Sequence, residues 1–359
     1  MAAEAVLLGI VFEPLQALRL HGSGDRVARE QAPGAIPGEE PLLPRLETLI
    51  GALASLAYRT GLVSDDASGR GDWCEYSLGA AAKLLGCTSP GSWITGPFLV
   101  ARGISTSNKR VFINVSTGLL DADAVDEWVE IAAELREAAA KTLPRERHWA
   151  RMEAAERIQR LIEEGKLVPW YAVTQRFTSV ALEPRTKSAM YNLVYTYTRI
   201  HVHIVPAETG LYPAGIALIA QCNASGEKHV PTSIVSLGPR STPALLLATR
   251  LGPETIPEDN EPPYIAVSNA PLWSSIDYAI HPLPPGPGLE AHARAYHTEY
   301  GKGFRKDRAR ASLWPGTVIT QKKQDNKDTQ PCENTPALRH APSTKLIKKI
   351  TTTLKNTLP

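Results

Sequence analysis

The stretch between Tyr191 and Ile204 alternates between two kinds of residue. One set of alternate positions carries aromatic and basic side chains: Tyr191, Tyr195, Tyr197, Arg199, His201 and His203. The positions between them are mostly β-branched: Val194, Thr196, Thr198, Ile200, Val202 and Ile204. A period of two predicts a strand with one face against a core. The other face suits stacked bases and phosphates, and the alternative is an ordinary amphipathic sheet whose exposed face is rich in tyrosine.

Two other stretches could contact phosphate groups. Gly238 and Arg240 lie in SLGPRST, where glycine lets the backbone approach a ligand and arginine can bind it bidentately. A hairpin turn explains the same residues. GKGFRKDRAR is the strongest basic cluster before the C-terminal tail, and its candidate RNA contacts are Lys302, Phe304, Arg305 and Lys306. The alternative for this cluster is a solvated surface loop.

Histidine side chains are the candidate catalytic bases if the protein is a nuclease. Metal-free RNA cleavage needs a base near the 2′-hydroxyl, and His21, beside Gly22 and Gly24, is the best candidate. A histidine that only forms structural hydrogen bonds is the alternative. His201 and His203 share a strand face, but the sequence places no third metal ligand near them. A Ser-His-Asp pattern, a P-loop and a dinucleotide fingerprint are all missing, so no catalytic residue, metal or cofactor is assigned.

Composition limits the kinds of protein that this chain can be. Its 359 residues, 43% of them hydrophobic, suffice for two domains with full cores. The net charge is +2, and residues 320–359 carry eight Lys or Arg against three acids, a net of +5, so the rest sums to −3. Overall charge therefore gives no support to nucleic-acid binding, which must rest on local clusters. The four cysteines are scattered, and neither a signal peptide nor an apolar run of about 18 residues is found. We therefore expect a cytoplasmic protein in a reducing compartment, with no membrane span and no zinc ribbon.

Hydrophobic periodicity predicts the elements that must position these residues. Val6–Phe12 is expected to be a buried first strand, and helices are expected over PRLETLIGALASLAYRTG, DADAVDEWVEIAAELREAAAK and RHWARMEAAERIQRLIEEG. In the last of these helices the residues expected to face the core are Trp149, Met152, Ile158, Leu161 and Ile162. Its Glu and Arg side chains are expected to form a solvated face. The polar residues 321–359, rich in Lys and Thr, are expected to form a disordered basic tail.

Several stretches, taken in order, resemble motifs of the RAMP superfamily, the repeat-associated proteins of CRISPR effector complexes. They are FEPLQALRLHGSG, PLLPRLETLIGALASL, WITGPFLV, EPRTKSAMYNLVYTYTRI, VSLGPRSTPALL and WPGTVI. Within the superfamily, the chain is most similar to the type III-B (Cmr) subunit that binds the 5′ handle of the guide RNA beside the large polymerase-like subunit. The alternative within the same group is its type III-A counterpart. One departure is that Pro239 and Ser241 replace glycines of the family's Leu-Gly-Gly-x-Gly-Arg loop.

The resemblance implies an α+β fold of two ferredoxin-like (RRM-like) domains, residues 1–180 and 181–320, with antiparallel sheets and helices on one face. Residues 321–359 would follow as the tail. It also implies a non-catalytic scaffold of a type III CRISPR ribonucleoprotein complex, bound to the guide (CRISPR) RNA, the large polymerase-like subunit and the backbone RAMP subunits. Two alternatives are a metal-independent endoribonuclease that processes CRISPR repeat RNA and a protein-interaction module. The RNA-binding residues of the scaffold would be Arg19, His21, Tyr195, Tyr197, Arg199, Gly238, Arg240, Lys302, Phe304, Arg305 and Lys306.

Overall fold

The structure is a computed structural model, and it describes most of the chain in separate ranges. These are residues 6–15, 19–20, 43–64, 74–89, 91–103, 109–115, 118–169, 174–182, 186, 189–200, 211–222, 230–237, 242–251, 261–268, 270–271, 276–283, 292–297, 312–322 and 335–357. The fold is α+β with antiparallel sheets, as predicted.

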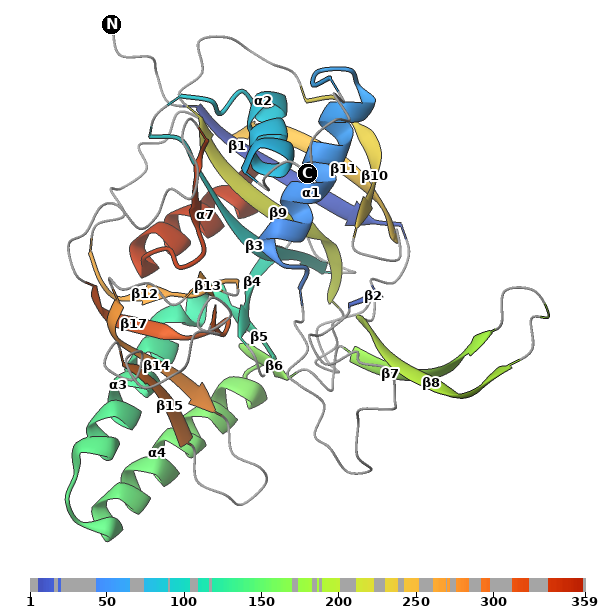
Figure 1. Ribbon diagram of the computed structural model, residues 1–359. Helices are drawn as coiled ribbons and strands as arrows, with labels where there is room; N and C mark the ends of the chain where they lie inside the picture. Colours follow the sequence, from blue (N-terminus) through green and yellow to red (C-terminus); the bar gives the residue numbers. More distant parts are fainter. Residues whose placement is uncertain are drawn as a thin grey trace, which may run out of the picture.

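The largest element is a nine-stranded sheet that crosses the molecule (Figure 1). Its strands are β1 (Val6–Pro14), β3 (Trp93–Gly103), β4 (Lys109–Val115), β5 (Gly118–Asp121), β6 (Leu167–Pro169), β9 (Leu211–Cys222), β10 (Ser233–Leu237), β11 (Thr242–Leu251) and β18 (Ala337–Arg339). The order across the sheet is β10-β11-β1-β9-β3-β4-β5-β6, with β18 beside β3. Neighbours are antiparallel, except that β18 runs parallel to β3.

Helices cover both faces of this sheet. Helices α1 (Leu46–Arg59) and α2 (Ala80–Leu85) contribute to one hydrophobic cluster, together with alternate residues of the strands. Helices α3 (Val125–Ala140), α4 (Pro144–Glu163) and α7 (Thr344–Thr357) contribute to a second cluster with the other alternate residues. The central strand β3 is therefore buried almost throughout, which explains its nearly continuous apolar sequence.

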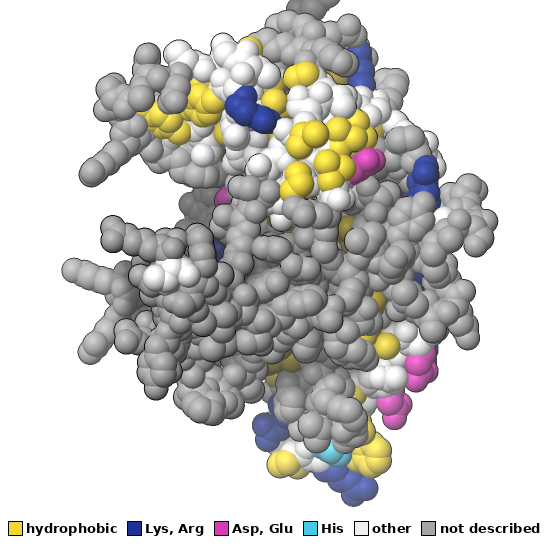
Figure 2. All heavy atoms as spheres, turned by 90° about the vertical axis from the view of Figure 1, so that its right-hand side faces the viewer, with side chains coloured by type: hydrophobic (Ala, Val, Ile, Leu, Met, Phe, Trp, Pro, Cys, Tyr) yellow, Lys and Arg dark blue, Asp and Glu magenta, His cyan; other side chains and the backbone are white. Residues whose placement is uncertain are grey.

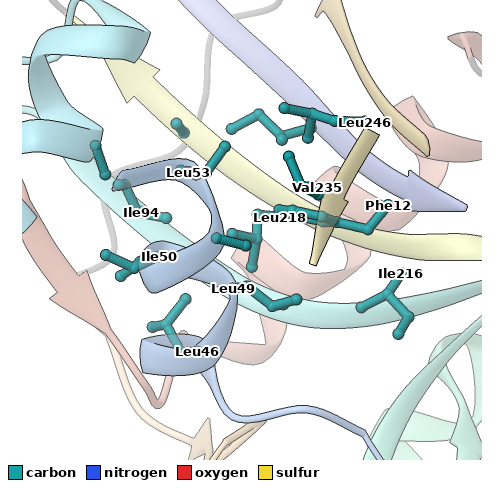
Figure 3. Close-up of a cluster of buried hydrophobic side chains, with 14 of the residues drawn as sticks. Phe12, Leu46, Leu49, Ile50, Leu53, Ile94, Ile216, Leu218, Val235 and Leu246 are labelled. Atoms are coloured by element: carbon teal, nitrogen blue, oxygen red, sulfur yellow. The ribbon is translucent and has the colours of Figure 1, made fainter. Parts of the chain in front are cut away.

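The first hydrophobic cluster fixes α1 across the strands (Figure 3). Its apolar stripe was predicted from helical spacing, and the helix begins and ends within two residues of the expected limits, Pro44 and Gly61. Gly61 has φ of +69°, a conformation that glycine adopts without strain. The labelled side chains of this cluster are Phe12, Leu46, Leu49, Ile50, Leu53, Ile94, Ile216, Leu218, Val235 and Leu246.

The boundary predicted at residue 180 does not separate two sheets. Strand β9 lies between β1 and β3 and pairs with both, and β11 pairs with the other edge of β1. Strands from both sides of residue 180 therefore take part in the nine-stranded sheet. The physical reason is burial: Ile216 to Ala220 of β9 is apolar on both faces, and only an interior position in the sheet covers both.

The prediction of a disordered tail over residues 321–359 is wrong for the part that the structure describes. Residues 337–339 form β18, and residues 344–357 form α7. Four apolar side chains of α7 are buried in the second cluster: Leu346, Ile347, Ile350 and Leu354. The helical spacing of these four residues in TKLIKKITTTLK predicts an amphipathic helix, but the composition, rich in Lys and Thr, suggests disorder instead.

The lysines of α7 are engaged within the chain. Lys355 Nζ lies 2.7 Å from Asp123 Oδ2, Lys348 pairs with Asp126, and Lys345 pairs with Glu261. The hydrogen bond and charge of Lys345 lower the pKa of the Glu261 carboxyl. Because these cations already have carboxylate partners, they are not a free arm for RNA.

A smaller sheet packs beside α3 and is tied to it by tryptophan. Its order is β12-β17-β14-β15, and its members are β12 (Tyr264–Ile265), β14 (Ile276–Leu283), β15 (His292–His297) and β17 (Val318–Lys322). Strands β13 (Ala270–Pro271) and β16 (Ser312–Leu313) form a separate pair. The buried indole Nε1 of Trp128 on α3 donates a 2.9 Å hydrogen bond to the Gly316 carbonyl, just before β17. The WPGTVI motif thus serves packing.

Helices α3 and α4 form a hairpin that projects from the body, at the lower end of Figure 1. The buried residues of α4 are Ala154, Ala155, Ile158 and Leu161, so residues 144–153 lie beyond the core. The inward position predicted for Trp149 is therefore wrong, since its side chain is 62% exposed. Helical spacing correctly placed Ile158 and Leu161 but does not indicate where the body ends.

Two of the scattered cysteines meet in the fold. Cys87, just after α2, and Cys222, at the end of β9, are both buried and form a disulfide with Cα atoms 4.5 Å apart. The spacing of 135 residues predicted no such pair. The contact arises because α2 packs over β9 in the first cluster. Within the described ranges, no helix is long and apolar enough to span a membrane.

Candidate nucleic-acid interface

The predicted aromatic and basic strand belongs to a three-stranded sheet that is separate from the two larger sheets. Its order is β2-β8-β7, with β2 (Arg19–Leu20), β7 (Thr174–Leu182) and β8 (Ala189–Ile200), all antiparallel. The β7–β8 ribbon extends away from the body of the molecule (Figure 1). The predicted strand is confirmed as far as Ile200, while His201 and His203 lie outside the described residues.

The register places the candidate contacts side by side. Arg199 pairs with Arg19 on one neighbouring strand and with Gln175 on the other. Tyr197 pairs with Phe177, and Tyr195 pairs with Ser179. Because alternate residues of a strand share a face, one face of this sheet holds all of these positions. Arg19, Tyr195, Tyr197 and Arg199 are therefore brought together, although 176 residues separate the first two in sequence, as 195 minus 19.

The opposite face of the same sheet has a different chemistry. Its paired positions are Val180 with Val194, Thr178 with Thr196, Arg176 with Thr198, and Thr174 with Ile200. These residues are mostly β-branched and suit packing. The register thus keeps the contrast that the sequence alternation predicts, with aromatic and basic positions on one face and mostly β-branched positions on the other.

Two members of the aromatic and basic face were not anticipated from the sequence. Phe177 and Gln175 belong to β7, whose sequence TQRFTSVAL also alternates, with Gln175, Phe177 and Ser179 on one face. That period of two is the signal that could have found them. Their alignment with Arg199 and Tyr197 depends on the register between two strands, which the sequence of either strand alone does not specify.

The remaining candidate contacts lie outside the described residues and stay predictions. They are His21, Gly238, Arg240, Lys302, Phe304, Arg305 and Lys306. For Gly238 and Arg240 the flanking strands are informative, because Leu237 of β10 pairs with Thr242 of β11. The strands on either side of this stretch are therefore antiparallel neighbours, and both the hairpin turn and the phosphate contact stay predictions.

A serine, a histidine and a glutamate meet elsewhere in the fold, but these residues have a structural role and not a catalytic one. His340 Nδ1 lies 2.9 Å from Ser268 Oγ, and its Nε2 lies 3.8 Å from Glu47 Oε1. Ser268 and His340 are only 3% and 5% exposed, so no substrate can reach the hydroxyl. Burial lowers the pKa of His340, and the nearby charge of Glu47 opposes this shift in part. Ser268, His340 and Glu47 therefore connect three distant segments of the chain, and the serine does not serve as a nucleophile.

The glycine of another family-like motif is also explained by packing. Gly96 of WITGPFLV lies in β3 with φ of +136°, and a Cβ there would be 2.8 Å from Leu218 of β9. Glycine is required because the neighbouring strand approaches so closely. Over the described ranges, no group of three or more His, Cys, Asp or Glu is placed to hold a metal ion.

Comparisons with known proteins give similarities to solved structures only. No protein-family model matches the sequence, and no curated protein matches it. Two solved structures align over 87% of this chain and 86% of their own chain, each at 13% identity. They are a cryo-EM structure of the Type III-B Cmr-beta bound to cognate target RNA, with a TM-score of 0.46, and the same complex with AMPPnP in state 1, with a TM-score of 0.44. Similarity at this level assigns no function to the chain.

Proposed function

We propose that this chain is a non-catalytic, RNA-binding scaffold subunit of a type III CRISPR effector complex, which holds the 5′ handle of the guide RNA. The observation that carries the proposal is the register of the β2-β8-β7 sheet. It gathers Arg19, Arg199, Tyr197, Tyr195 and Phe177 on one face. The family-like motifs of the sequence then indicate which RNA-binding complex the face serves.

The pairing of Arg19 with Arg199 favours an anionic ligand. Like charges directly opposite one another on neighbouring strands destabilise a sheet. A phosphate between the two guanidiniums would reverse this effect, because each can form charge-assisted hydrogen bonds to its oxygens. The two arginines would thereby fix the sugar-phosphate backbone without reading the bases.

The aromatic positions beside the arginines supply the second half of the interaction. Tyr195, Tyr197 and Phe177 lie next to the Arg19–Arg199 pair on the same face. Stacking of one base on an aromatic ring is worth about 1–3 kcal/mol, so two stacked bases would supply roughly 2–6 kcal/mol. Sheet surfaces of this kind bind unpaired RNA, whose bases are free to stack. A single-stranded handle therefore fits this face better than a duplex.

The other parts of the proposal concern assembly. As a scaffold in the cytoplasm, the protein would use surfaces away from this sheet to contact the large polymerase-like subunit and the backbone RAMP subunits. The proposed role uses no cofactor, no metal and no membrane. Lys302, Phe304, Arg305, Lys306 and Arg240 would extend the grip on the RNA backbone.

The test is incubation of the purified chain with a labelled repeat-derived RNA in the absence of metal, with retention and cleavage scored on one gel. We expect retention without cleavage. Replacing both Tyr195 and Tyr197 by alanine should weaken binding by about 2–6 kcal/mol, from the loss of two stacks. The matched control replaces Thr196 and Thr198, on the other face of the same strand, by alanine and should bind like the unchanged protein.

Two outcomes would overturn the proposal. Equal weakening by the two double variants would show that the strand matters only for folding. Cleavage that disappears with His21→Ala would instead identify the protein as the endoribonuclease that processes repeat RNA.

A further inference from the structure

The tip of the α3–α4 hairpin exposes large apolar side chains. Trp149 is 62% exposed and Leu143 is 56% exposed. Tryptophan is on average one of the more buried residue types, and isolated exposed apolar residues need no explanation, but two together at one tip do. Figure 2 shows hydrophobic, basic and histidine side chains gathered at the lower end of the molecule, where the hairpin ends in Figure 1.

The same tip is basic. Between residues 137 and 151 there are four cations and two carboxylates, a net charge of +2. The cations are Lys141, Arg145, Arg147 and Arg151, and the carboxylates are Glu137 and Glu146. Nearer the body, Arg157 binds both Glu134 and Glu130, the latter at 2.7 Å, so one cation there is shared by two carboxylates. Burial lowers the pKa of Arg157, but its bonds to these two carboxylates outweigh burial and raise it.

Trp149 has a cation and a second ring next to it. Arg145 precedes it by four residues on α4, and residues four apart are neighbours on one face of a helix. The imidazole ring of His148 lies edge-on to the indole, with ring centroids 6.3 Å apart. An exposed indole flanked by an arginine offers a flat stacking surface and a hydrogen-bond donor for an anion at its rim.

The size of the tip decides between the classes of partner that could use it. Two helix ends side by side, each about 10 Å across, present roughly 200 Å². A stable protein interface takes about 800 Å² from each partner, which the tip alone does not offer. One base stacked on a ring and the phosphates on either side of it need far less surface, and they account for both the exposed indole and the positive charge.

We propose that the α3–α4 tip is a separate contact point for single-stranded RNA, where Trp149 stacks on one base and Arg145 binds an adjacent phosphate. The tip is distinct from the β2-β8-β7 sheet. The choice of RNA over single-stranded DNA as the ligand rests on the proposed function. The contact of Trp149 and Arg145 with a nucleic-acid strand rests on the tip alone.

The experiment measures binding of a short fluorescein-labelled oligouridylate to the full chain by fluorescence anisotropy over a range of salt concentrations. Trp149→Ala should weaken binding about 5- to 150-fold, the loss of one base stack, while Trp149→Phe should keep most of the affinity. Arg145→Ala should reduce the slope of log K against log salt by about 0.7, as expected for one phosphate contact. Ile234→Ala is the matched control, because Ile234 is 57% exposed on β10, far from the tip in sequence.

The outcomes separate this inference from the proposed function. If Trp149→Ala and Arg145→Ala bind like the unchanged chain while the Tyr195 and Tyr197 variants bind weakly, the tip contact is refuted and the sheet assignment stands. If only the tip variants bind weakly, the tip contact stands and the sheet assignment fails. Trp149-dependent binding of an acidic peptide, without any effect of Trp149 on RNA affinity, would identify a protein partner and overturn the inference. Equal affinity for oligothymidylate and oligouridylate would refute only the choice of RNA.

Discussion

The clearest energetic consequence of the fold concerns Ile350 of α7, which is 1% exposed in the second hydrophobic cluster. Ile350→Ala removes three carbon atoms from this cluster, worth about 2.4 kcal/mol at roughly 0.8 kcal/mol each. The cavity left behind adds to this loss, and we expect the free energy of unfolding to fall by about 3–4 kcal/mol. Lys348→Ala removes only a half-exposed ion pair with Asp126, and exposed pairs of this kind contribute about 0–1 kcal/mol.

Urea denaturation followed by tryptophan fluorescence and circular dichroism measures both variants against the unchanged chain. A lower midpoint at constant slope for Ile350→Ala, with little change for Lys348→Ala, would show that buried apolar side chains hold α7 in place. The reasoning would be refuted if Ile350→Ala lay within about 0.5 kcal/mol of the unchanged protein, the range of ordinary surface substitutions. In that case residues 344–357 would contribute nothing to the core.

Three further predictions follow from buried contacts. Trp128→Phe leaves the Gly316 carbonyl without its indole donor and should cost about 2–4 kcal/mol in the same denaturation assay; a loss below about 1 kcal/mol would contradict the hydrogen bond. Gly316→Ala should destabilise by more than about 1 kcal/mol, because φ is +88° and the new Cβ would lie 2.7 Å from Val115, and an unchanged midpoint would argue against this packing. His340 has a lowered pKa in the fold, so below about pH 6.5 the unfolded chain binds more protons than the native one. The free energy of unfolding should therefore decrease as the pH is lowered below about 6.5, by at most about 1.4 kcal/mol per pH unit. His340→Gln should remove this part of the pH dependence, and identical pH profiles for both proteins would contradict the prediction.

Local patterns in the sequence predicted the chemistry of β8 and the position of α1. A period of two over Tyr191–Ile200 depends only on the strand itself, and the structure confirms it there. The apolar stripe of α1 is equally local, and both of its ends carry the residues expected of a helix boundary. These elements were predictable because each signal lies within one continuous segment.

Long-range pairings could not be predicted in this way. Nothing in the sequence near β9 indicates that it lies between β1 and β3, and nothing near Arg19 indicates that it pairs with Arg199. Sheet register depends on which strands meet, and the meeting strands are more than a hundred residues apart. For this reason, the sequence does not indicate that strands from both sides of residue 180 share one sheet.

Two other errors came from giving one signal too much weight. The lysines and threonines of residues 344–357 suggested disorder, although Leu346, Ile347, Ile350 and Leu354 recur at helical spacing. Trp149 was expected inside because it falls in the same helical pattern as Ile158 and Leu161. Helical periodicity identifies the residues that share a face, but the end of the core depends on the other elements that cover it.

The central claim is that one face of the β2-β8-β7 sheet binds single-stranded RNA, and photo-crosslinking tests it most directly. A repeat-derived RNA carrying 4-thiouridine would be irradiated with the full chain, and the crosslinked peptides identified by mass spectrometry. The account predicts crosslinks at Tyr195, Tyr197 or Phe177, which are lost when the tyrosines are replaced by alanine. Crosslinks at Thr196 and Thr198, or none within residues 174–200, would contradict it.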